Sequence, residues 1–186
     1  MKLIAGLGNP GKKYENSRHN VGFRIIEKLA YRHNAKLKKN LFKKCRQANL
    51  SVSGEDIILI QPLTFMNLSG TNILYFYKKL NLFLKDILII CDDINLPLGK
   101  VRIRPSGSSG GHNGLESVIG SLKSEGFPRL RIGIKTEENI EDLSEYVLSE
   151  FKDNEERIIE NTIDDAVNTC ETWIKDGTEI TMSKFN

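Results

Sequence analysis

Residues 2–33, KLIAGLGNPGKKYENSRHNVGFRIIEKLAYRH, contain a strand, a turn and a helix in that order. The apolar run over residues 2–7 predicts the strand, and the Gly, Asn and Pro residues that follow it predict the turn. A polar stretch then leads into a helix predicted over about residues 21–33. A strand connected in this way to a helix is typical of α/β proteins.

The rest of the chain continues to alternate strands with helices. Strands are predicted over residues 50–53, 57–61, 86–91, 101–104 and 130–134, and helices over about 70–80, 114–123 and 155–175, with Gly177 as the last C-cap. The 186 residues, 39% of them hydrophobic, suit one globular domain, and they contain no internal repeat or linker. We therefore expect one α/β domain over residues 1–186, with a twisted mixed β-sheet flanked by helices.

Two classes of protein are disfavoured by the apolar runs and the cysteines. Runs such as residues 57–60 and 87–91 are far too short to span a bilayer, and the chain opens without a signal-peptide pattern, so we expect a cytoplasmic protein. Cys45, Cys91 and Cys170 are odd in number and widely spaced. They favour reduced thiols over a disulfide framework or a paired metal-ligand motif.

The net charge of +3 hides a strong asymmetry. Residues 1–135 hold 23 Lys or Arg against 9 Asp or Glu, a net +14, whereas residues 136–186 hold 4 against 15, a net −11. Basic clusters at residues 36–46 and 100–104 would attract a polyanion by counterion release. The alternative is that these clusters are solvated faces, so charge alone does not establish nucleic-acid binding.

The turn over residues 6–11, GLGNPG, matches the G-x-G-x-x-G pattern of dinucleotide-binding proteins. We reject that interpretation because Pro10 removes an amide donor, the polar run over residues 12–18 delays the helix, and no second strand ends in an acid about 20 residues on. A tight turn that needs glycines is the simpler explanation. The turn nevertheless holds Asn9 at the end of the first strand, where it could meet a ligand.

Among the three histidines, His19 is the best candidate for a catalytic base. It lies in the polar stretch between the turn and the helix, and an imidazole titrates near neutral pH, which suits the activation of water. The alternative is a histidine at a helix start that is satisfied by local hydrogen bonds. His33 resembles a surface residue, and His112 in a glycine-rich loop could be a turn residue.

Asp92 and Asp93 directly follow the apolar run 87–91, at the predicted carboxyl end of a strand. Open α/β sheets bind ligands beyond such ends, and a carboxylate there could orient an imidazole and stabilise its protonated form. No Cys, His or Glu constellation completes a metal site, so we favour a metal-free mechanism. A Cys91 nucleophile is conceivable, although a cysteine that closes an apolar strand is more often a small buried side chain.

Asn67 and Asn113 each lie in a loop that runs into a predicted helix. N-capping is the simpler role for both. The functional alternative is that neutral amides, which donate and accept, orient a water and an ester or peptide carbonyl without adding charge.

Six motifs along the chain together suggest a family. They are GLGNPG with KY (residues 6–14), SRHNVGF (17–23), P-x-TFMN-x-SG (62–70), DD-x-x-LP (92–97), GGHNG (110–114) and RLRIGI (129–134). In these motifs the chain resembles the bacterial-type peptidyl-tRNA hydrolases over essentially its whole length. The resemblance implies an α/β domain with a mixed sheet, and an enzyme that needs no cofactor and cuts the ester between the peptide and the terminal ribose of tRNA.

The resemblance also implies roles for individual residues. His19 would be the base that activates water, Asp92 would stabilise it, and Asn9 would help to discriminate N-blocked peptidyl from free aminoacyl substrates. The peptide and terminal-adenosine site would be lined by Tyr14, Phe65, Asn67 and Asn113. The tRNA phosphates would be held by Arg104 and Arg131, both of which lie in the basic part of the chain.

The chain departs from the family pattern at Ser17, Cys91 and Asn95, and none of these changes removes a proposed catalytic group. We expect a monomer whose partner is peptidyl-tRNA, with no membrane and no obligate protein partner. Three rival hypotheses remain at this point. They are a non-catalytic RNA-binding relative of the same fold, a nucleotide-dependent oxidoreductase and a cysteine hydrolase that uses Cys91.

Overall fold

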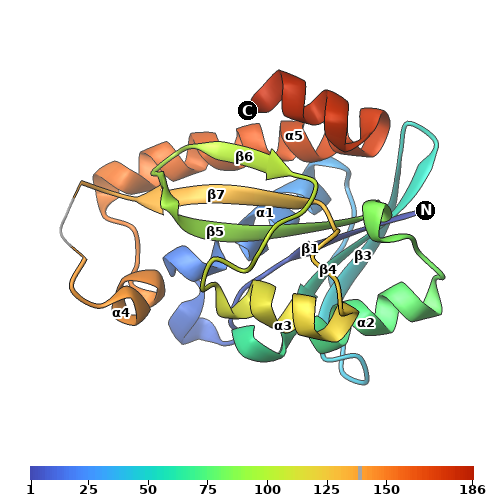
Figure 1. Cartoon of the computed structure of the whole chain (residues 1–186), viewed down its shortest axis with the longest axis horizontal. Coiled ribbons are helices and arrows are strands. Elements are labelled where there is room, and N and C mark those ends of the chain that lie inside the picture. The colour runs from blue at the N-terminus through green and yellow to red at the C-terminus, as the bar shows by residue number, and fades with distance from the viewer. Residues whose placement is uncertain (138–139) are drawn as a thin grey trace.

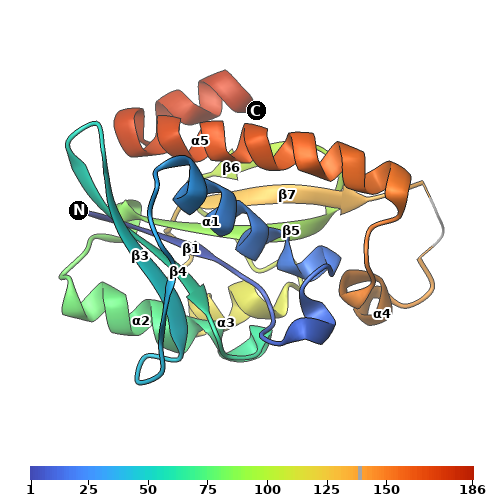
Figure 2. The ribbon, with the colours of Figure 1, turned by 180° about the vertical axis from the view of Figure 1, so that it is seen from behind.

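A computed structural model describes residues 1–137 and 140–186. One β-sheet forms the middle layer, with helices α2 and α3 on the face toward the viewer in Figure 1 and helices α1 and α5 on the face seen in Figure 2. The short helix α4 lies apart from these layers, at one end of the sheet. This arrangement is the predicted sheet flanked by helices, and the strands turn visibly from β7 to β3, as a twisted sheet requires.

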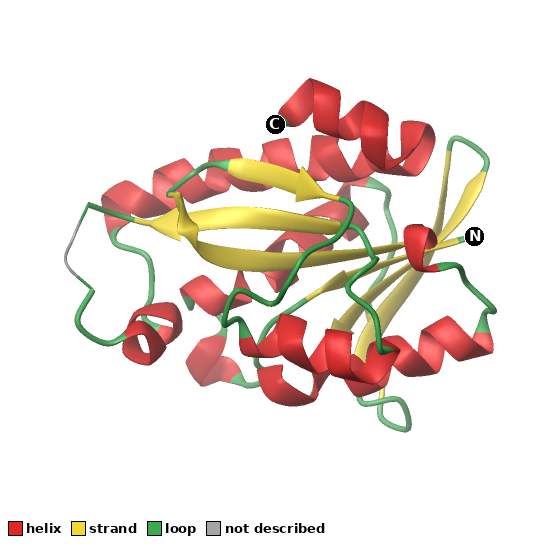
Figure 3. Cartoon of the chain, viewed as in Figure 1, coloured by secondary structure: helices red, strands yellow, loops and turns green. Residues whose placement is uncertain are grey.

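The order of elements along the chain is clear when they are coloured by type (Figure 3). The strands are β1 (Lys2–Gly6), β2 (Lys38–Asn40), β3 (Cys45–Val52), β4 (Glu55–Pro62), β5 (Ile87–Pro97), β6 (Val101–Arg104) and β7 (Arg129–Lys135). The α-helices are α1 (Val21–Arg32), α2 (Ser69–Lys79), α3 (Asn113–Leu122), α4 (Leu143–Leu148) and α5 (Asp153–Phe185). Short 3-10 helices are η1 (Lys12–Tyr14), η2 (Arg18–Asn20), η3 (Met66–Leu68) and η4 (Leu84–Asp86).

The strands of the described residues form one mixed sheet in the order β2-β3-β4-β1-β5-β7-β6. Strand β1 pairs in parallel with β4 and β5, and β5 pairs in parallel with β7. The pairs β2–β3, β3–β4 and β6–β7 are antiparallel. The carboxyl ends of the four central strands therefore lie at the same edge of the sheet, where a ligand site is expected.

Alternating side chains of the central strands build a core on each face of the sheet. In β5, Leu88 and Ile90 pack with α1 and α5, whereas Ile87 and Ile89 pack with α2 and α3. Both sets are fully buried. This explains why the central strands are continuous apolar runs, because parallel strands that are covered on both faces have no solvent side.

Close contact between α1 and the sheet depends on two glycines. A Cβ atom on Gly22 would lie 2.6 Å from the Leu7 carbonyl oxygen and 2.8 Å from that of Ile90, and one on Gly6 would lie 2.2 Å from the Gly22 carbonyl oxygen. No side chain fits at these distances. The first turn of α1, and η2 immediately before it, are thereby brought against the carboxyl ends of β1 and β5.

Several elements differ from the sequence-based predictions, and strand β3 begins at Cys45 rather than at the predicted residue 50. Strand β5 continues to Pro97, so Asp92 and Asp93 lie within it rather than after its end, and its register with β7 shifts between Asp93 and Pro97. The short elements β2 and α4 were not predicted, because three or six residues carry too little periodicity. Gly177, with φ of 79°, interrupts helix α5, but a further helical stretch follows it.

The acidic end of the chain, for which no contact was predicted, lies along the basic helix α1. Helix α5 presents its carboxylates to cations of α1 across the interface seen in Figure 2. The ion pairs are Arg24–Glu156, Lys28–Asp164, Arg32–Asp164 and Arg32–Glu171. Part of the opposite charge of the two chain halves is therefore neutralised internally.

Within the described residues no helix is both long and apolar enough to cross a membrane.

Candidate active site

His19 and Asp92 are in direct contact at the carboxyl edge of the sheet. The Nδ1 atom of His19 lies 2.8 Å from Oδ1 of Asp92, and both side chains are buried. Because the carboxylate accepts the Nδ1 proton, Nε2 of the neutral ring is left as the atom that can take a proton. His19 lines a cavity of about 370 Å³, so this base has access to a bound ligand or water.

A second histidine, His112, donates to the same carboxylate oxygen. Its Nδ1 atom caps helix α3 by accepting hydrogen bonds from the backbone N–H groups of Gly114 (3.0 Å) and Leu115 (3.2 Å). A nitrogen that accepts carries no proton, so the proton of the neutral ring is on Nε2, which lies 3.0 Å from Asp92 Oδ1. The cap therefore determines the tautomer of His112 and directs its N–H to Asp92.

The electrostatics of the pair follow from burial and charge. Burial disfavours the charged imidazole, but the Asp92 carboxylate and its hydrogen bond outweigh this effect, so the pKa of His19 is raised above its ordinary value. Burial also disfavours the Asp92 carboxylate, yet the two histidines favour it more strongly, and its pKa lies well below the ordinary value. Asp92 is thus ionised at neutral pH and stabilises a positive charge on His19.

Two local structures hold His19 against Asp92. On one side, Gly22 lets α1 approach β1 and β5. On the other side, the neighbouring Arg18 is buried, pairs with Glu155 at 2.7 Å, and lies over the rings of Tyr146 (4.4 Å) and Phe151 (4.8 Å). The 3-10 turn that carries His19 is therefore fixed both to the sheet and to the segment around α4.

Asn9 is held by a pair of hydrogen bonds with Asn20. The Asn9 backbone N–H donates to Asn20 Oδ1 (2.8 Å), and Asn20 Nδ2 donates to the Asn9 carbonyl oxygen (3.0 Å). The Asn9 side-chain oxygen accepts from the Met66 backbone N–H (2.9 Å). The amide orientation is therefore determined, and its Nδ2 donor is left for a ligand.

The cavity beside His19 is bounded by the loop over residues 105–112, the start of α3, and α4. Among the predicted site residues it is lined by His19, Asp92, Asn113, Arg104 and Arg131. The buried Arg129 holds the loop by donating to the carbonyl oxygens of Ser108 and Glu125, each at 2.9 Å. The glycine-rich loop that carries His112 is thus tied to β7.

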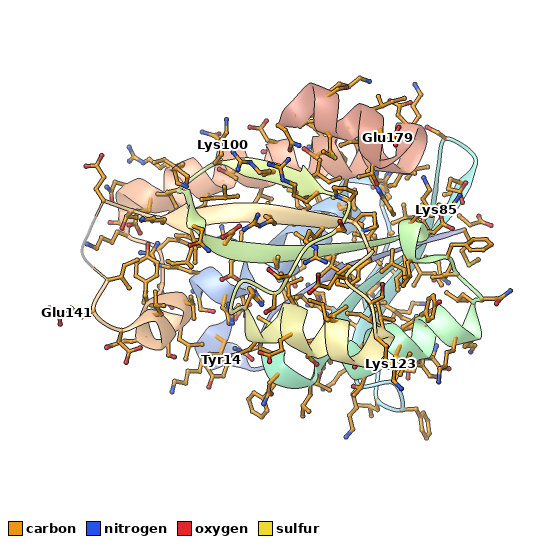
Figure 4. All side chains as sticks on the ribbon, viewed as in Figure 1. Tyr14, Lys85, Lys100, Lys123, Glu141 and Glu179 are labelled. Carbon is orange, nitrogen blue, oxygen red and sulfur yellow. The ribbon has the colours of Figure 1, made fainter. Side chains whose placement is uncertain are left out.

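The other predicted residues do not line this cavity. Asn9 lines a second cavity of about 310 Å³, together with its partner Asn20. Tyr14 is half-buried in η1, and Figure 4 shows it at the same end of the molecule as the start of α3. Phe65 and Asn67 are exposed at η3. N-capping was the simpler interpretation of Asn67 and Asn113, but neither caps a helix, and His112 caps α3 instead.

The two arginines predicted to hold phosphates differ in their surroundings. Arg131 forms an ion pair with Asp93 through its Nε atom, and its side chain remains 29% exposed. Arg104 is half-buried at the end of β6, beside Arg129 in the register with β7. Both line the cavity, together with Arg129 and with the carboxylates of Asp92 and Asp93.

A metal or a cysteine nucleophile fits this arrangement poorly. Within the described residues, the group that could hold a metal is His19, Asp92 and His112, whose ligand atoms lie within 4.8 Å of one another. Those same atoms already form hydrogen bonds to each other. Cys91 is buried in β5, and burial raises the pKa of its thiol far above the ordinary value, so it is neither accessible nor ionised.

Sequence reasoning missed Asn20 and did not distinguish His112 from a turn residue. Asn20 directly follows His19, and its role depends on a contact with Asn9 across eleven residues. His112 follows two glycines and precedes the helix, a position at which a side-chain acceptor caps the first turn. That capping position was the one available signal in the sequence.

Comparisons with known proteins agree along the whole chain. A family model described as peptidyl-tRNA hydrolase matches residues 3–186. Proteins named peptidyl-tRNA hydrolase from Methylacidiphilum infernorum and Bacillus cytotoxicus are 45% and 44% identical, covering 99% and 100% of this chain and 97% and 100% of their own lengths. A crystal structure of peptidyl-tRNA hydrolase from Acinetobacter baumannii, 33% identical, superposes with a TM-score of 0.93 over 100% of this chain and 94% of that one.

Proposed function

The chain belongs to the peptidyl-tRNA hydrolase family and hydrolyses the ester between peptide and tRNA; we propose that His19 is the general base of this reaction. The observation that carries the proposal is the buried contact between His19 Nδ1 and Asp92 Oδ1, which leaves Nε2 as the proton acceptor of a residue that lines the cavity. Such an enzyme returns tRNA to use when translation stalls or is aborted.

In the proposed mechanism, Nε2 of His19 takes a proton from a water molecule. The water oxygen attacks the ester carbonyl carbon and forms a tetrahedral intermediate. Asp92 stabilises the imidazolium that forms. The tetrahedral intermediate collapses by breaking the bond to the ribose oxygen, which receives the proton from His19 and leaves as a free hydroxyl. An ester has a better leaving group than an amide, so a positioned base and hydrogen bonds suffice without a covalent nucleophile.

Asparagine side chains supply the polar contacts of the proposed substrate site. Asn9, with its oxygen held by Met66, presents Nδ2 to a peptide carbonyl and so favours N-blocked substrates. Contacts to the peptide and the terminal adenosine come from Tyr14, Phe65, Asn67 and Asn113. Because Phe65 and Asn67 are exposed, their contribution is to a surface that the substrate covers on binding.

On the tRNA side, Arg104 and Arg131 bind backbone phosphates. Each phosphate contact releases counterions, so the affinity for tRNA falls as salt rises, with a slope of about 0.7 to 0.9 per contact. Arg104→Ala should reduce that slope by about one contact, measured as log Kd against log salt. An unchanged slope would remove Arg104 from the phosphate contacts. Arg131 should contribute less, because Asp93 already neutralises it.

The decisive assay is release of an N-acetyl-amino acid from N-acetyl-aminoacyl-tRNA, beside unblocked aminoacyl-tRNA, with EDTA present. We expect metal-independent cleavage of the blocked substrate only. His19→Ala should lose most turnover while it keeps its affinity for tRNA, because His19 is not a phosphate contact. Retained turnover in that variant would exclude His19 as the base. Binding of tRNA without cleavage by the unmodified protein would indicate a non-catalytic RNA-binding protein.

We place the activity in the cytoplasm, where peptidyl-tRNA arises, and expect a monomer with no obligate protein partner. Sedimentation of the protein alone and with tRNA tests the oligomeric state. The cysteine-hydrolase hypothesis has a separate test, which is activity after alkylation under native conditions. Full activity is expected because Cys91 is buried.

A further inference from the structure

A second surface of unusual composition lies at the turn between β2 and β3, which passes beside α2 at the lower edge of Figures 1 and 2. It combines exposed apolar side chains with lysines. Phe42 is fully exposed, at 103%, Leu41 is 72% exposed and Tyr75 of α2 is 41% exposed. We call this surface the hairpin patch; it consists of Leu41, Phe42, Lys43, Lys44, Tyr75 and Lys79.

The hairpin patch is a structured feature and not a loose loop tip. Asn40 Oδ1 accepts from the Lys43 backbone N–H (3.1 Å), and the Lys44 carbonyl oxygen accepts from the Leu63 N–H (2.7 Å) at the end of β4. The Nζ atom of Lys43 lies over the rings of Tyr75 (5.5 Å) and Phe76 (5.1 Å). The turn is therefore held to β4 by its backbone and to α2 by Lys43, while the Phe42 ring extends into solvent.

The charge around the hairpin patch has one sign. Residues 36–48 hold six Lys or Arg and residues 57–85 hold three, and neither range contains an Asp or Glu. Glu27 of α1 reaches this region, but its carboxylate forms an ion pair with Arg46. Unlike the cations of α1, which face the acidic helix α5, these lysines have no acidic helix against them in the described part of the chain.

We propose that the hairpin patch is a second RNA contact, which binds the phosphate backbone and an unpaired base of the tRNA away from its 3′ end. The inference rests on the proposed function, since it takes tRNA as the occupant. Lysines around exposed aromatic rings suit RNA, because cations neutralise phosphates and rings stack on bases without requiring a particular sequence.

Two other occupants fit the observations less well. A peptide released by translation has no constant charge, so it does not account for the three lysines of the hairpin patch. A second copy of the chain, related by a twofold axis, would place two such basic surfaces against each other, and like charges at a desolvated contact repel. A polyanion is therefore the occupant that the charge favours.

The test compares two substrates on variants of exposed residues. One substrate is full-length N-acetyl-aminoacyl-tRNA, and the other is the same N-acetyl-aminoacyl ester on a CCA trinucleotide, which lacks the rest of the tRNA. Lys44→Glu with Lys79→Glu removes phosphate contacts, and Phe42→Ser, made separately, removes a stacked base, so each variant should raise KM for the full-length substrate at least about fivefold. The kcat/KM for the trinucleotide substrate should change less than twofold.

Matched controls are Lys175→Glu and Tyr31→Ser, which change an exposed lysine and an exposed aromatic residue on the α1–α5 side. These should leave both substrates unaffected. An unchanged KM for the full-length substrate in the hairpin variants would overturn the proposal. An equal loss on both substrates would also overturn it, because the patch would then act on the reaction site. Losses that grow with peptide length on the same tRNA would assign the surface to the peptide and overturn the proposal.

Binding is measured independently of hydrolysis, as the anisotropy of labelled uncharged tRNA over a range of salt. The double lysine variant should reduce the salt slope by about 0.7 to 0.9 for each lost phosphate contact, and Phe42→Ser should weaken binding without changing the slope. If the unmodified protein failed to hydrolyse the ester, the proposed function would fail, while this measurement would still decide the hairpin patch. Lys44→Ala and thermal melts exclude misfolding as the cause.

Discussion

Replacement of Asp92 by Asn is the sharpest test of the active-site geometry, because it removes a charge while it keeps the size and shape of the side chain. The oxygen of the new amide could still accept from His19 Nδ1 and His112 Nε2, which lie 2.8 Å and 3.0 Å from the carboxylate oxygen it replaces. What the amide cannot supply is the negative charge that stabilises the imidazolium of His19. The variant therefore isolates the electrostatic contribution of the carboxylate.

The expected magnitude follows from the distance and the burial of the pair. An opposite charge within about 4 to 6 Å shifts a pKa by about 1 to 3 units, which is about 1.4 to 4 kcal/mol. If the transition state carries most of the imidazolium charge, kcat should fall about 10- to 1000-fold. If the new amide turns its NH2 group toward Nδ1, the wrong tautomer forms and the loss should approach about 10,000-fold, as in serine-protease triads.

The shift in the pKa of His19 predicts the direction in which the pH profile of the Asp92→Asn variant moves. His19 must be neutral to act as a base, so kcat/KM rises with pH through the pKa of His19. In the unmodified protein that pKa is raised above 6.5, because the effect of Asp92 exceeds the effect of burial. Without the carboxylate, burial remains and lowers the pKa. The acid limb of the profile should therefore move to lower pH even though the maximal rate falls.

The assay is kcat and kcat/KM for N-acetyl-aminoacyl-tRNA between about pH 5 and 8, with tRNA affinity measured at each pH. A loss in kcat of less than tenfold would refute the electrostatic role of Asp92. An acid limb that stays in place, or moves to higher pH, would show that another group controls the profile. Lost tRNA affinity would indicate a structural effect instead.

Three further substitutions test parts of the structure around this pair. His112→Asn should still cap α3 but no longer donate to Asp92 as His112 does, so the full carboxylate charge acts on the base and the acid limb should move to higher pH. Glu155→Gln leaves the buried Arg18 charge without its partner and should reduce the free energy of unfolding by about 3 to 5 kcal/mol in urea titrations. Gly22→Ala should cost about 1 to 3 kcal/mol or more by forcing α1 from the sheet, and activity should fall with it.

The substitutions of Glu155 and Gly22 each have a control in the same chain. Asp164→Asn breaks exposed pairs of α5 and should change stability by less than about 1 kcal/mol, so an equal effect would contradict the argument for Glu155. Gly120 of α3 has open space around its Cβ position, and Gly120→Ala should stabilise the helix by about 0.5 to 1 kcal/mol. For His112→Asn, an acid limb shifted in the same direction as in the Asp92 variant would refute the assigned hydrogen bond.

Sequence alone was sufficient for the fold class and the family. The alternation of apolar runs with amphipathic segments predicted the mixed sheet between helices, and the order of motifs predicted the peptidyl-tRNA hydrolase family, which the comparisons confirm. Both could be predicted because hydrophobic periodicity and the order of motifs are read directly from the sequence, without knowledge of contacts between distant residues. His19 and Asp92 were also identified as candidates before their contact was known.

Only the tertiary structure showed which polar groups form hydrogen bonds with one another. The position of His112 before a helix indicates a cap, but nothing in the order of residues shows that its other nitrogen reaches Asp92, or that Asn20 holds Asn9. The contact of His112 with Asp92 joins residues 20 apart, on helix α3 and strand β5, and the contact of Asn20 with Asn9 joins residues 11 apart. Side-chain direction at that scale is set by packing and not by sequence pattern.

The distribution of charge shows the same division. The sequence predicted a basic part and an acidic part, but only the fold decided that helix α5 pairs with cations of α1 while Lys44 and Lys79 of the hairpin patch stay exposed to solvent. Coulomb energy depends on distance and burial, and neither quantity exists until the chain is folded. A sequence can therefore count its charges, whereas only the structure determines which of them remain available to a partner.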